Sequence, residues 1–165
     1  MQDIKFFEID KEYIDYMCQF DNILFHNKQA HQKNERKYIG ILFEVENLDY
    51  FVPLSSFKPK HAGMRESVDF IKLGEYAVVN LGSMVPVVKH CCHYIDFSEV
   101  ADTKYRSLLV AEYIEIKNRK DTILKNAKIV YSHKLHNGND TQLARRCADF
   151  KLLEEKAREY EKSLH

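Results

Sequence analysis

The sequence predicts an α+β domain in which an antiparallel sheet is covered by helices. Three observations support this fold class. Segments rich in β-branched and aromatic residues fill the first half of the chain, as far as Val88. After Asp102, apolar residues recur at helical spacing instead. Strand-like and helix-like segments do not alternate, so the parallel sheet of a βαβ protein is not expected.

The chain is expected to open with a strand followed by a helix. IKFFEI, residues 4–9, has the composition of a strand. Asp10 can cap a helix in which apolar residues recur at one-turn spacing from Tyr13 to Cys18. Residues 22–35 are polar with little periodicity, which predicts a long loop of the kind that often carries function.

A hairpin is expected at the centre of the sheet. It comprises KYIGILFEVE, residues 37–46, and YFVPL, residues 50–54, joined by residues 47–49. Three further strands are expected at residues 67–73, 76–81 and 84–88. Pro86 lacks an N–H group for strand pairing, so its strand should lie at a sheet edge or contain a bulge.

Long amphipathic helices should follow the sheet. An apolar stripe runs through residues 105–116 and continues through residues 123–131. HNGND, residues 136–140, interrupts the pattern, and a last helix is expected within residues 141–162. Because there is no internal repeat, low-complexity tract or linker, residues 1–165 are interpreted as one domain.

Composition agrees with a folded, single-domain protein. Hydrophobic residues make up 45% and charged residues 30% of 165 residues, with only 5 Gly and 3 Pro, which argues against a disordered or fibrous chain. No apolar run approaches the roughly 20 residues of a membrane-spanning helix, and MQDIKFFEID lacks the features of a signal peptide. The protein is therefore expected in the cytoplasm, and its four cysteines are expected as reduced thiols.

Charge is balanced overall but uneven along the chain. The 25 basic and 25 acidic residues cancel, which argues against nonspecific nucleic-acid binding by the whole surface. Residues 1–50 carry 6 basic and 10 acidic side chains, whereas residues 101–165 carry 14 and 10. Local basic patches can bind a polyanion without a basic isoelectric point, although many helical charges are simply solvated.

PLSSFKPKH, residues 53–61, is the segment that points most directly to chemistry. Two hydroxyls end a strand here, and a dense basic loop follows. Hydroxyls and strand-end N–H groups can hold phosphate oxygens while lysines supply positive charge, so the segment predicts an anion site. The alternative is a hydroxyl-stabilised turn with a solvated basic loop.

This pattern is suited to RNA cleavage. RNA carries its own nucleophile, the 2′-hydroxyl, so a cleaving protein needs orientation and charge rather than a covalent nucleophile or a metal. His61 or His31 could transfer protons near neutral pH, although many histidines are structural or exposed. Dinucleotide, Walker, zinc-peptidase and α/β-hydrolase motifs do not occur in the sequence.

Four segments follow one another in an order typical of one family. They are RKYIGIL at residues 36–42, YFVPLSS with a following lysine at 50–58, VNLGSMVPVV at 79–88, and DFKLLEEKAREY at 149–160. Together they resemble the toxins of type III toxin–antitoxin systems, the ToxN, AbiQ and CptN endoribonucleases. The resemblance covers nearly the whole chain and implies a strongly twisted antiparallel sheet flanked by helices, similar to the Kid and MazF toxins.

The resemblance also implies an activity and a partner. It implies a sequence-selective, metal-independent endoribonuclease without a cofactor, which leaves 2′,3′-cyclic phosphate and 5′-hydroxyl ends on cellular or phage RNA. The implied partner is a small repeat-encoded RNA pseudoknot, which the toxin cuts from a precursor and which then inhibits it in a closed heteromeric assembly. Such systems inhibit growth and act in phage defence by abortive infection.

The resemblance further implies roles for individual residues. Ser55 and Ser56 match the family's paired hydroxyls and Lys58 matches its lysine, so these three are the expected catalytic residues. Arg36 or Lys37 matches the basic residue before the Y-I-G-I strand and should bind phosphate.

The loop around the lysine departs from the family pattern. Relatives often have proline where this chain has Phe57, and Pro59 follows Lys58, so Lys60 is an alternative for the catalytic lysine. The remaining expected RNA-binding residues are Lys33, Lys60, His61 and His31.

Two other functions compete with this interpretation. A noncatalytic module could use the same basic patches to bind structured RNA by its shape. A metal-dependent hydrolase could use Cys91, Cys92 and His93, although buried thiols in a strand are commoner than metal ligands.

Overall fold

The computed structural model describes residues 3–25 and 36–164. Its strands are β1 (Lys5–Ile9), β2 (Tyr38–Gly40), β3 (Glu44–Val45), β4 (Leu48–Ser56), β5 (Phe70–Leu73), β6 (Ala77–Asn80), β7 (Val85–Val88) and β8 (Cys92–Tyr94). Its α-helices are α1 (Lys11–Cys18), α2 (Asn22–Phe25), α3 (Pro59–Ala62), α4 (Thr103–Asn118), α5 (Lys120–Asn137), α6 (Gln142–Arg146) and α7 (Phe150–Ser163). Three short 3-10 helices, η1 (Leu81–Ser83), η2 (Lys89–Cys91) and η3 (Phe97–Glu99), link strands and helices.

The strands form one antiparallel sheet organised around β4. The main path of the sheet is β5-β6-β4-β2-β1-β8, and β3 and β7 pair with the first part of β4. Each of the assigned pairings is antiparallel, which confirms the predicted α+β class. Since β4 pairs with four strands, it is the strand best held in place by the rest of the sheet.

The predicted hairpin is present, but its turn lies earlier than expected. Val45 pairs with Leu48, so only Glu46 and Asn47 connect β3 to β4. Both have positive φ, 45° and 74°, as a tight two-residue hairpin turn requires. The expected connection at residues 47–49 is therefore wrong, because Leu48 and Asp49 are buried and already belong to β4.

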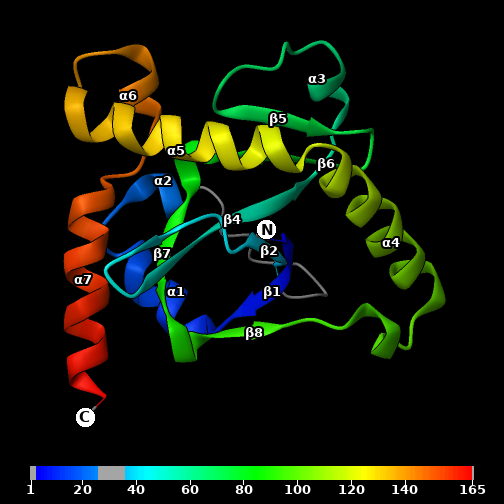
Figure 1. Ribbon diagram of the computed structural model, residues 1–165, viewed down its shortest axis with the longest axis horizontal. Coiled ribbons are helices and arrows are strands. Elements are labelled where there is room, and N and C mark those ends of the chain that lie inside the picture. The colour runs from blue at the N-terminus through cyan, green and yellow to red at the C-terminus, as the bar shows by residue number, and fades with distance from the viewer. Residues whose placement is uncertain (1–2, 26–35, 165) are drawn as a thin grey trace.

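Helices surround the sheet on several sides. Figure 1 shows α7 at the left, α5 across the top and α4 at the right, with α1 and α2 behind the sheet near α7. On α4, Tyr113 packs against Phe6 of β1 at a ring separation of 6.3 Å. Phe150 of α7 packs edge-on against Tyr50 of β4 at 5.9 Å. The aromatic residues of the predicted helical stripes are thus part of the core, as expected.

A buried carboxylate joins α5, α7 and β4. The hydroxyls of Tyr50 and Tyr131 both donate to Glu154 Oε2, each at 2.6 Å. Glu154 is 2% exposed, so this carboxylate is stabilised inside the protein by its two tyrosine donors and by Lys151 at 3.3 Å. Burial, and then Glu154 itself, raises the pKa of both tyrosines.

Several element boundaries differ from the sequence prediction. The last helix is divided into α6 and α7, because the Asp149 carboxylate accepts a hydrogen bond from the Leu152 N–H and starts a new helix there. Within the expected loop 22–35, residues 22–25 form α2, and residues 26–35 lie outside the described part of the chain. The short strand β8 was not predicted.

Other expectations agree with the structure. The helix after Asp10 is present as α1, although Asp10 makes no side-chain cap there. Pro86 lies in β7, for which β4 is the pairing partner assigned within the described residues, so the edge position is confirmed. Among the helices described here, none is both long and apolar enough to cross a membrane.

Candidate functional site

The pairing of β2 with β4 brings Arg36 next to Ser55. The register pairs Tyr38 with Pro53, and the Leu54 N–H donates to the Lys37 carbonyl at 2.9 Å. One residue further along each strand, the Arg36 Nη1 donates to the Ser55 Oγ at 3.4 Å. Both residues are half-buried at the end of the strand, so a guanidinium and a hydroxyl can contact the same anion there.

Burial affects the Arg36 side chain without removing its charge. Desolvation lowers the pKa of Arg36, and the neighbouring Tyr38 opposes that effect. Arginine remains protonated under ordinary conditions, so a partly desolvated positive charge is held beside Ser55. A charge in such a position interacts more strongly with a phosphate than a fully solvated one does.

Lys37 and Ser56 lie on the opposite face of the sheet from Arg36 and Ser55, because neighbouring residues of a strand alternate between faces. Lys37 pairs with Glu8 of β1 at 2.8 Å and is only 12% exposed. Its ammonium also lies 5.7 Å from the centre of the Tyr105 ring on α4. The structure therefore places the two predicted phosphate-binding residues differently: Arg36 lies beside Ser55, and Lys37 is engaged with Glu8.

Glu8 and Tyr105 were not among the candidates chosen from the sequence. Glu8 lies 29 positions before Lys37, and their pairing depends on the register of β1 with β2. The spacing of these two residues in the sequence does not predict their ion pair. An acidic residue in the first strand and a basic residue in the second are nevertheless compatible with a cross-strand pair.

Lys58 and Lys60 lie on the turn that leaves the end of β4. Lys58 precedes the single-turn helix α3 in an extended conformation, and Pro59 begins the helix. Both lysines are exposed, so either ammonium is accessible to a ligand at the strand end. The exposed hydroxyl of Ser56 lies just before this turn.

His61 occupies a different environment from its basic neighbours. It is 7% exposed, and its ring packs against Phe57 and Phe70 with centroid distances of 5.6 and 5.8 Å. Its Nδ1 accepts a hydrogen bond from the Lys58 backbone N–H at 2.8 Å. Burial, followed by the positive charges of nearby lysines, lowers the pKa of His61. The two remaining predicted residues, His31 and Lys33, lie outside the described residues.

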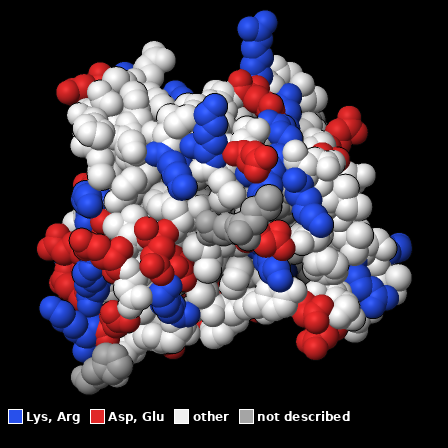
Figure 2. All heavy atoms as spheres, in the orientation of Figure 1, with Lys and Arg blue, Asp and Glu red and all other residues white. Residues whose placement is uncertain are grey.

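Basic side chains also gather away from this strand end. Figure 2 shows Lys and Arg side chains across the upper middle of the face on view, over α5 and the neighbouring end of α4. Exposed residues of these helices include Lys117, Lys125 and Lys128. The local positive charge predicted from the sequence is thus found on the surface of a chain whose net charge is zero.

The cysteine and histidine segment does not assemble a metal-ligand group. His93 Nε2 lies 2.6 Å from Asp10 Oδ1, and the Cys92 thiol donates to the Lys89 carbonyl. Cys91 is buried, and burial raises the pKa of its thiol to about 11. Within residues 3–25 and 36–164, no cluster of three or more potential metal ligands is found.

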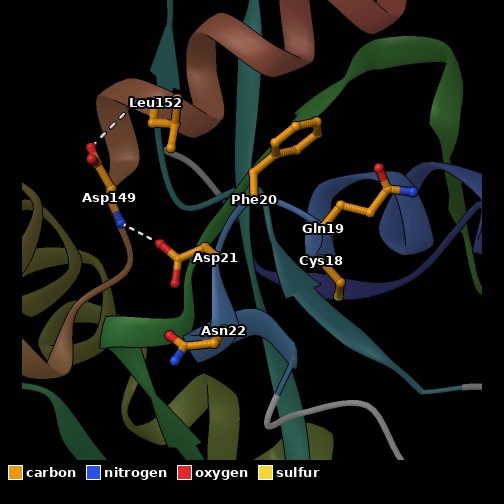
Figure 3. Close-up of a pocket in the computed structure, with 7 residues that line it drawn as sticks. All are labelled: Cys18, Gln19, Phe20, Asp21, Asn22, Asp149 and Leu152. Carbon is orange, nitrogen blue, oxygen red and sulfur yellow. Dashed lines mark hydrogen bonds between the residues drawn. The ribbon is translucent and has the colours of Figure 1, made fainter.

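A hollow between α1 and α7 is separate from the strand end. It is lined by Cys18, Gln19, Phe20, Asp21, Asn22, Asp149 and Leu152 (Figure 3). Asp21 Oδ2 accepts from the Asp149 N–H at 2.7 Å, while Asp149 Oδ1 accepts from the Leu152 N–H at 3.2 Å. Both carboxylates hold the start of α7 in place, and none of the predicted site residues lines this hollow.

Comparison with known proteins identifies relatives along nearly the whole chain. The family model of the toxin ToxN of type III toxin–antitoxin systems matches residues 5–158. The endoribonuclease ToxN of Bacillus thuringiensis subsp. kurstaki is 33% identical over 164 residues, which cover 94% of this chain and 84% of that protein.

Solved structures of similar fold agree with this sequence relationship. One, from work on a processed non-coding RNA that regulates a bacterial antiviral system, has a TM-score of 0.81 and 26% identity, covering 94% of this chain and 98% of that one. Another, from work on selective toxin inhibition by a non-coding RNA pseudoknot in type III systems, has a TM-score of 0.75 and 29% identity over 97% of this chain and 99% of that one.

Proposed function

This chain belongs to the ToxN family of type III toxin–antitoxin toxins, and on that premise we propose that it is a sequence-selective endoribonuclease toxin. The relative from Bacillus thuringiensis is named an endoribonuclease, and the family match spans the strand end described above. The observation that carries the proposal at the level of chemistry is the contact of Arg36 with Ser55, which lies three residues before the exposed Lys58.

The proposed reaction uses the RNA as its own nucleophile. The 2′-oxygen attacks the neighbouring phosphorus as its proton leaves, and the bond from phosphorus to the 5′-oxygen breaks as that oxygen gains a proton. The products are a 2′,3′-cyclic phosphate and a 5′-hydroxyl, so atoms and charges balance without a metal or cofactor. The protein then has to hold the phosphate in line and stabilise the negative charge of the phosphorane.

The residues of the strand end divide this work. Arg36 and Ser55 bind the non-bridging oxygens of the scissile phosphate from one face of the sheet. Ser56, exposed at the last position of β4, supplies a second hydroxyl from the other face at the strand end, and the Lys58 ammonium stabilises the phosphorane from the turn. Lys60 and the exposed lysines of α4 and α5 bind flanking RNA phosphates, whereas Lys37 stays paired with Glu8.

The proposed partner is a small RNA with a pseudoknot fold, produced from a repeat-containing precursor. Structures similar to this one come from work on a non-coding RNA that regulates a bacterial antiviral system and on toxin inhibition by a non-coding RNA pseudoknot. A folded RNA inhibitor is compatible with a net charge of zero, because it requires a local basic groove rather than a basic surface overall. We propose that the two form a closed heteromeric assembly in the cytoplasm, where the toxin acts on phage or cellular RNA.

The antiparallel sheet flanked by helices is the basis of a further structural proposal. We propose that this architecture is shared with the Kid and MazF toxins, whose sheets are also antiparallel and flanked by helices. Superposition of β1, β2, β4 and β6 on those proteins tests the relationship, and failure to align these strands in the same order would reject it.

The first experiment incubates the purified protein, in EDTA, with a transcript of the DNA immediately upstream of its gene. Cleavage once per repeat, with cyclic phosphate ends, is the expected result. Binding without cleavage would support the noncatalytic RNA-binding module instead. Activity lost in EDTA and restored by a divalent cation would reject the metal-independent mechanism.

Variants then test the assigned residues. We expect Arg36→Ala, Ser55→Ala and Lys58→Ala each to slow cleavage by about 10²- to 10³-fold, with RNA affinity reduced less than about tenfold. Lys60→Ala tests the alternative loop register, since a larger loss there than in Lys58→Ala would exchange their roles. Lys162→Ala, an exposed lysine at the end of α7, is the matched control and should leave the rate unchanged.

A further inference from the structure

The buried imidazole of His61 is the least expected feature of the basic turn. A turn dense in lysine would ordinarily expose all of its polar side chains, yet His61 is 7% exposed and packs between Phe57 and Phe70. The neighbouring Lys58 and Lys60 are both exposed. Burying an imidazole requires that its ring nitrogens be used, so its hydrogen bonds indicate its role.

Two reciprocal hydrogen bonds connect His61 with Lys58. The Lys58 backbone N–H donates to His61 Nδ1 at 2.8 Å, and the His61 backbone N–H donates to the Lys58 carbonyl at 2.8 Å. The side-chain bond and the backbone bond close a ring around the first turn of α3. The backbone of Lys58 is thereby held from both of its peptide groups.

The hydrogen bond also defines the protonation state of the ring. A nitrogen that accepts from a backbone N–H carries no hydrogen, so the proton of neutral His61 is on Nε2. The charged groups that act on the ring are Lys58 and Lys60 of the same turn and Lys72 of β5, all positive. Together with burial, they favour the neutral ring. The protonated ring would present an N–H to the Lys58 N–H and lose this bond.

The turn is also attached to β5 and to the residue that precedes β6. The Phe57 N–H donates to the Tyr76 carbonyl at 3.4 Å, and the Lys72 ammonium donates to the Ala62 carbonyl at 3.4 Å. These contacts hold the two ends of the segment 57–62. Between these ends, His61 holds the backbone of Lys58, whose side chain is the proposed catalytic group.

We propose that His61 is a positioning residue, whose neutral imidazole holds the Lys58 backbone so that the Lys58 ammonium points to the phosphate bound at the end of β4. This proposal rests on the proposed function, and it assigns the histidine neither proton transfer nor direct RNA contact. A displacement of about 1 Å at a reacting group can cost about 10²-fold in rate, so a single backbone hydrogen bond is sufficient for a measurable effect.

The test compares His61→Leu, which removes the acceptor, with His61→Asn, whose Oδ1 can take the place of Nδ1. We expect His61→Leu to slow RNA cleavage by 10- to 100-fold with RNA affinity within about threefold of wild type, and His61→Asn to recover most of the rate. His90→Leu, a change at an exposed histidine in η2, is the control. Equal rates for wild type and His61→Leu would overturn the proposal.

A double-mutant cycle with Lys58→Ala separates positioning from a general structural role. If His61 acts through Lys58, adding His61→Leu to Lys58→Ala causes no further loss. A loss of the same size in both backgrounds would mean that His61 acts independently of Lys58 and would reject the proposal. Thermal unfolding of each variant identifies rate losses that come from unfolding alone.

A final measurement does not depend on activity. 15N NMR of the wild-type protein should show the His61 ring protonated on Nε2. In hydrogen exchange, the Lys58 amide hydrogen should exchange slowly at pH 7 and faster once the imidazole is protonated. His61→Asn should retain slow exchange and His61→Leu should lose it. If the wild type fails to cleave RNA while these amide results hold, the proposed function is wrong, but the hydrogen bond between Lys58 and His61 stands. A protonated Nδ1 at neutral pH would refute the bond itself.

Discussion

Replacement of Glu154 by alanine should destabilise the protein strongly. The carboxylate accepts hydrogen bonds of 2.6 Å from the hydroxyls of Tyr50 and Tyr131, and Tyr50 is fully buried. A hydrogen bond to a charged group contributes about 1.5–3 kcal/mol, and a buried donor left without an acceptor costs a further about 1–3 kcal/mol. We therefore expect Glu154→Ala to lower the free energy of unfolding by about 3–5 kcal/mol.

For a chain of 165 residues this loss is easily measured. Each kcal/mol shifts the Tm by about 2–4 °C at this size, so calorimetry should find a Tm about 10 °C below that of the wild type. Glu155→Ala changes an exposed carboxylate on the same helix and should shift the Tm by less than about 2 °C. An equally small shift in Glu154→Ala would refute the reasoning that this network supports β4.

The same network predicts a dependence on alkaline pH. Burial first, and then Glu154, raises the pKa of Tyr50 and of Tyr131. Because the hydroxyls keep their protons longer in the folded state, their stabilising effect is fully present below pH about 10 and is lost as the pH rises above that value. Urea unfolding at pH 9 and pH 11 should show a steeper loss in the wild type than in Glu154→Gln.

Three further predictions concern other parts of the fold. Gly82→Ala should destabilise the protein by about 1–3 kcal/mol in chemical unfolding, because its new Cβ would lie 2.5 Å from the Arg146 carbonyl oxygen. The control Gly63→Ala places its Cβ with no atom within 4 Å and should change stability little. Burial raises the pKa of Glu112 to about 7, so wild-type stability should fall as the pH rises from about 4.5 to 7. Glu112→Gln should remove that pH dependence and should be about 2 kcal/mol more stable than the wild type at pH 8. Burial alone would raise the pKa of Asp69, but hydrogen bonds from Arg146 and Ser67 outweigh it and lower that pKa. The contribution of Asp69 to stability should therefore be present above pH about 4 and be lost at more acidic pH. Asp69→Asn should abolish this acid-sensitive part of the stability.

The elements were predictable from the sequence where local composition determines them. β1, β4 and the apolar stripes of α4 and α5 follow directly from β-branched residues and helical spacing. β8 was missed because Cys92–Tyr94 is short and pairs with Phe7–Ile9, more than 80 positions earlier. Pairing at that distance depends on tertiary structure, and three residues carry too little pattern to indicate it.

The candidate site was predictable in its residue types but not in its arrangement. The sequence indicated two hydroxyls, a lysine-rich loop and a basic residue before β2. It could not show that Arg36 contacts Ser55 whereas Lys37 pairs with Glu8, since both contacts depend on strand register. Nor could it show that His61 is buried, because the aromatic residues around it come from both sides of the turn.

The position of the site at the end of β4 has a physical reason. Catalysis by orientation requires groups held to within a fraction of an ångström, and β4 is held by four neighbouring strands and by the Tyr50–Glu154 bond. An RNA phosphate also needs open space, and at its last residues β4 keeps β6 as its partner on one side, whereas the assigned pairing with β2 on the other side ends at Pro53. Arg36 and Ser55 lie at that end, so the most firmly supported strand of the sheet presents its hydroxyl where a large ligand can reach it.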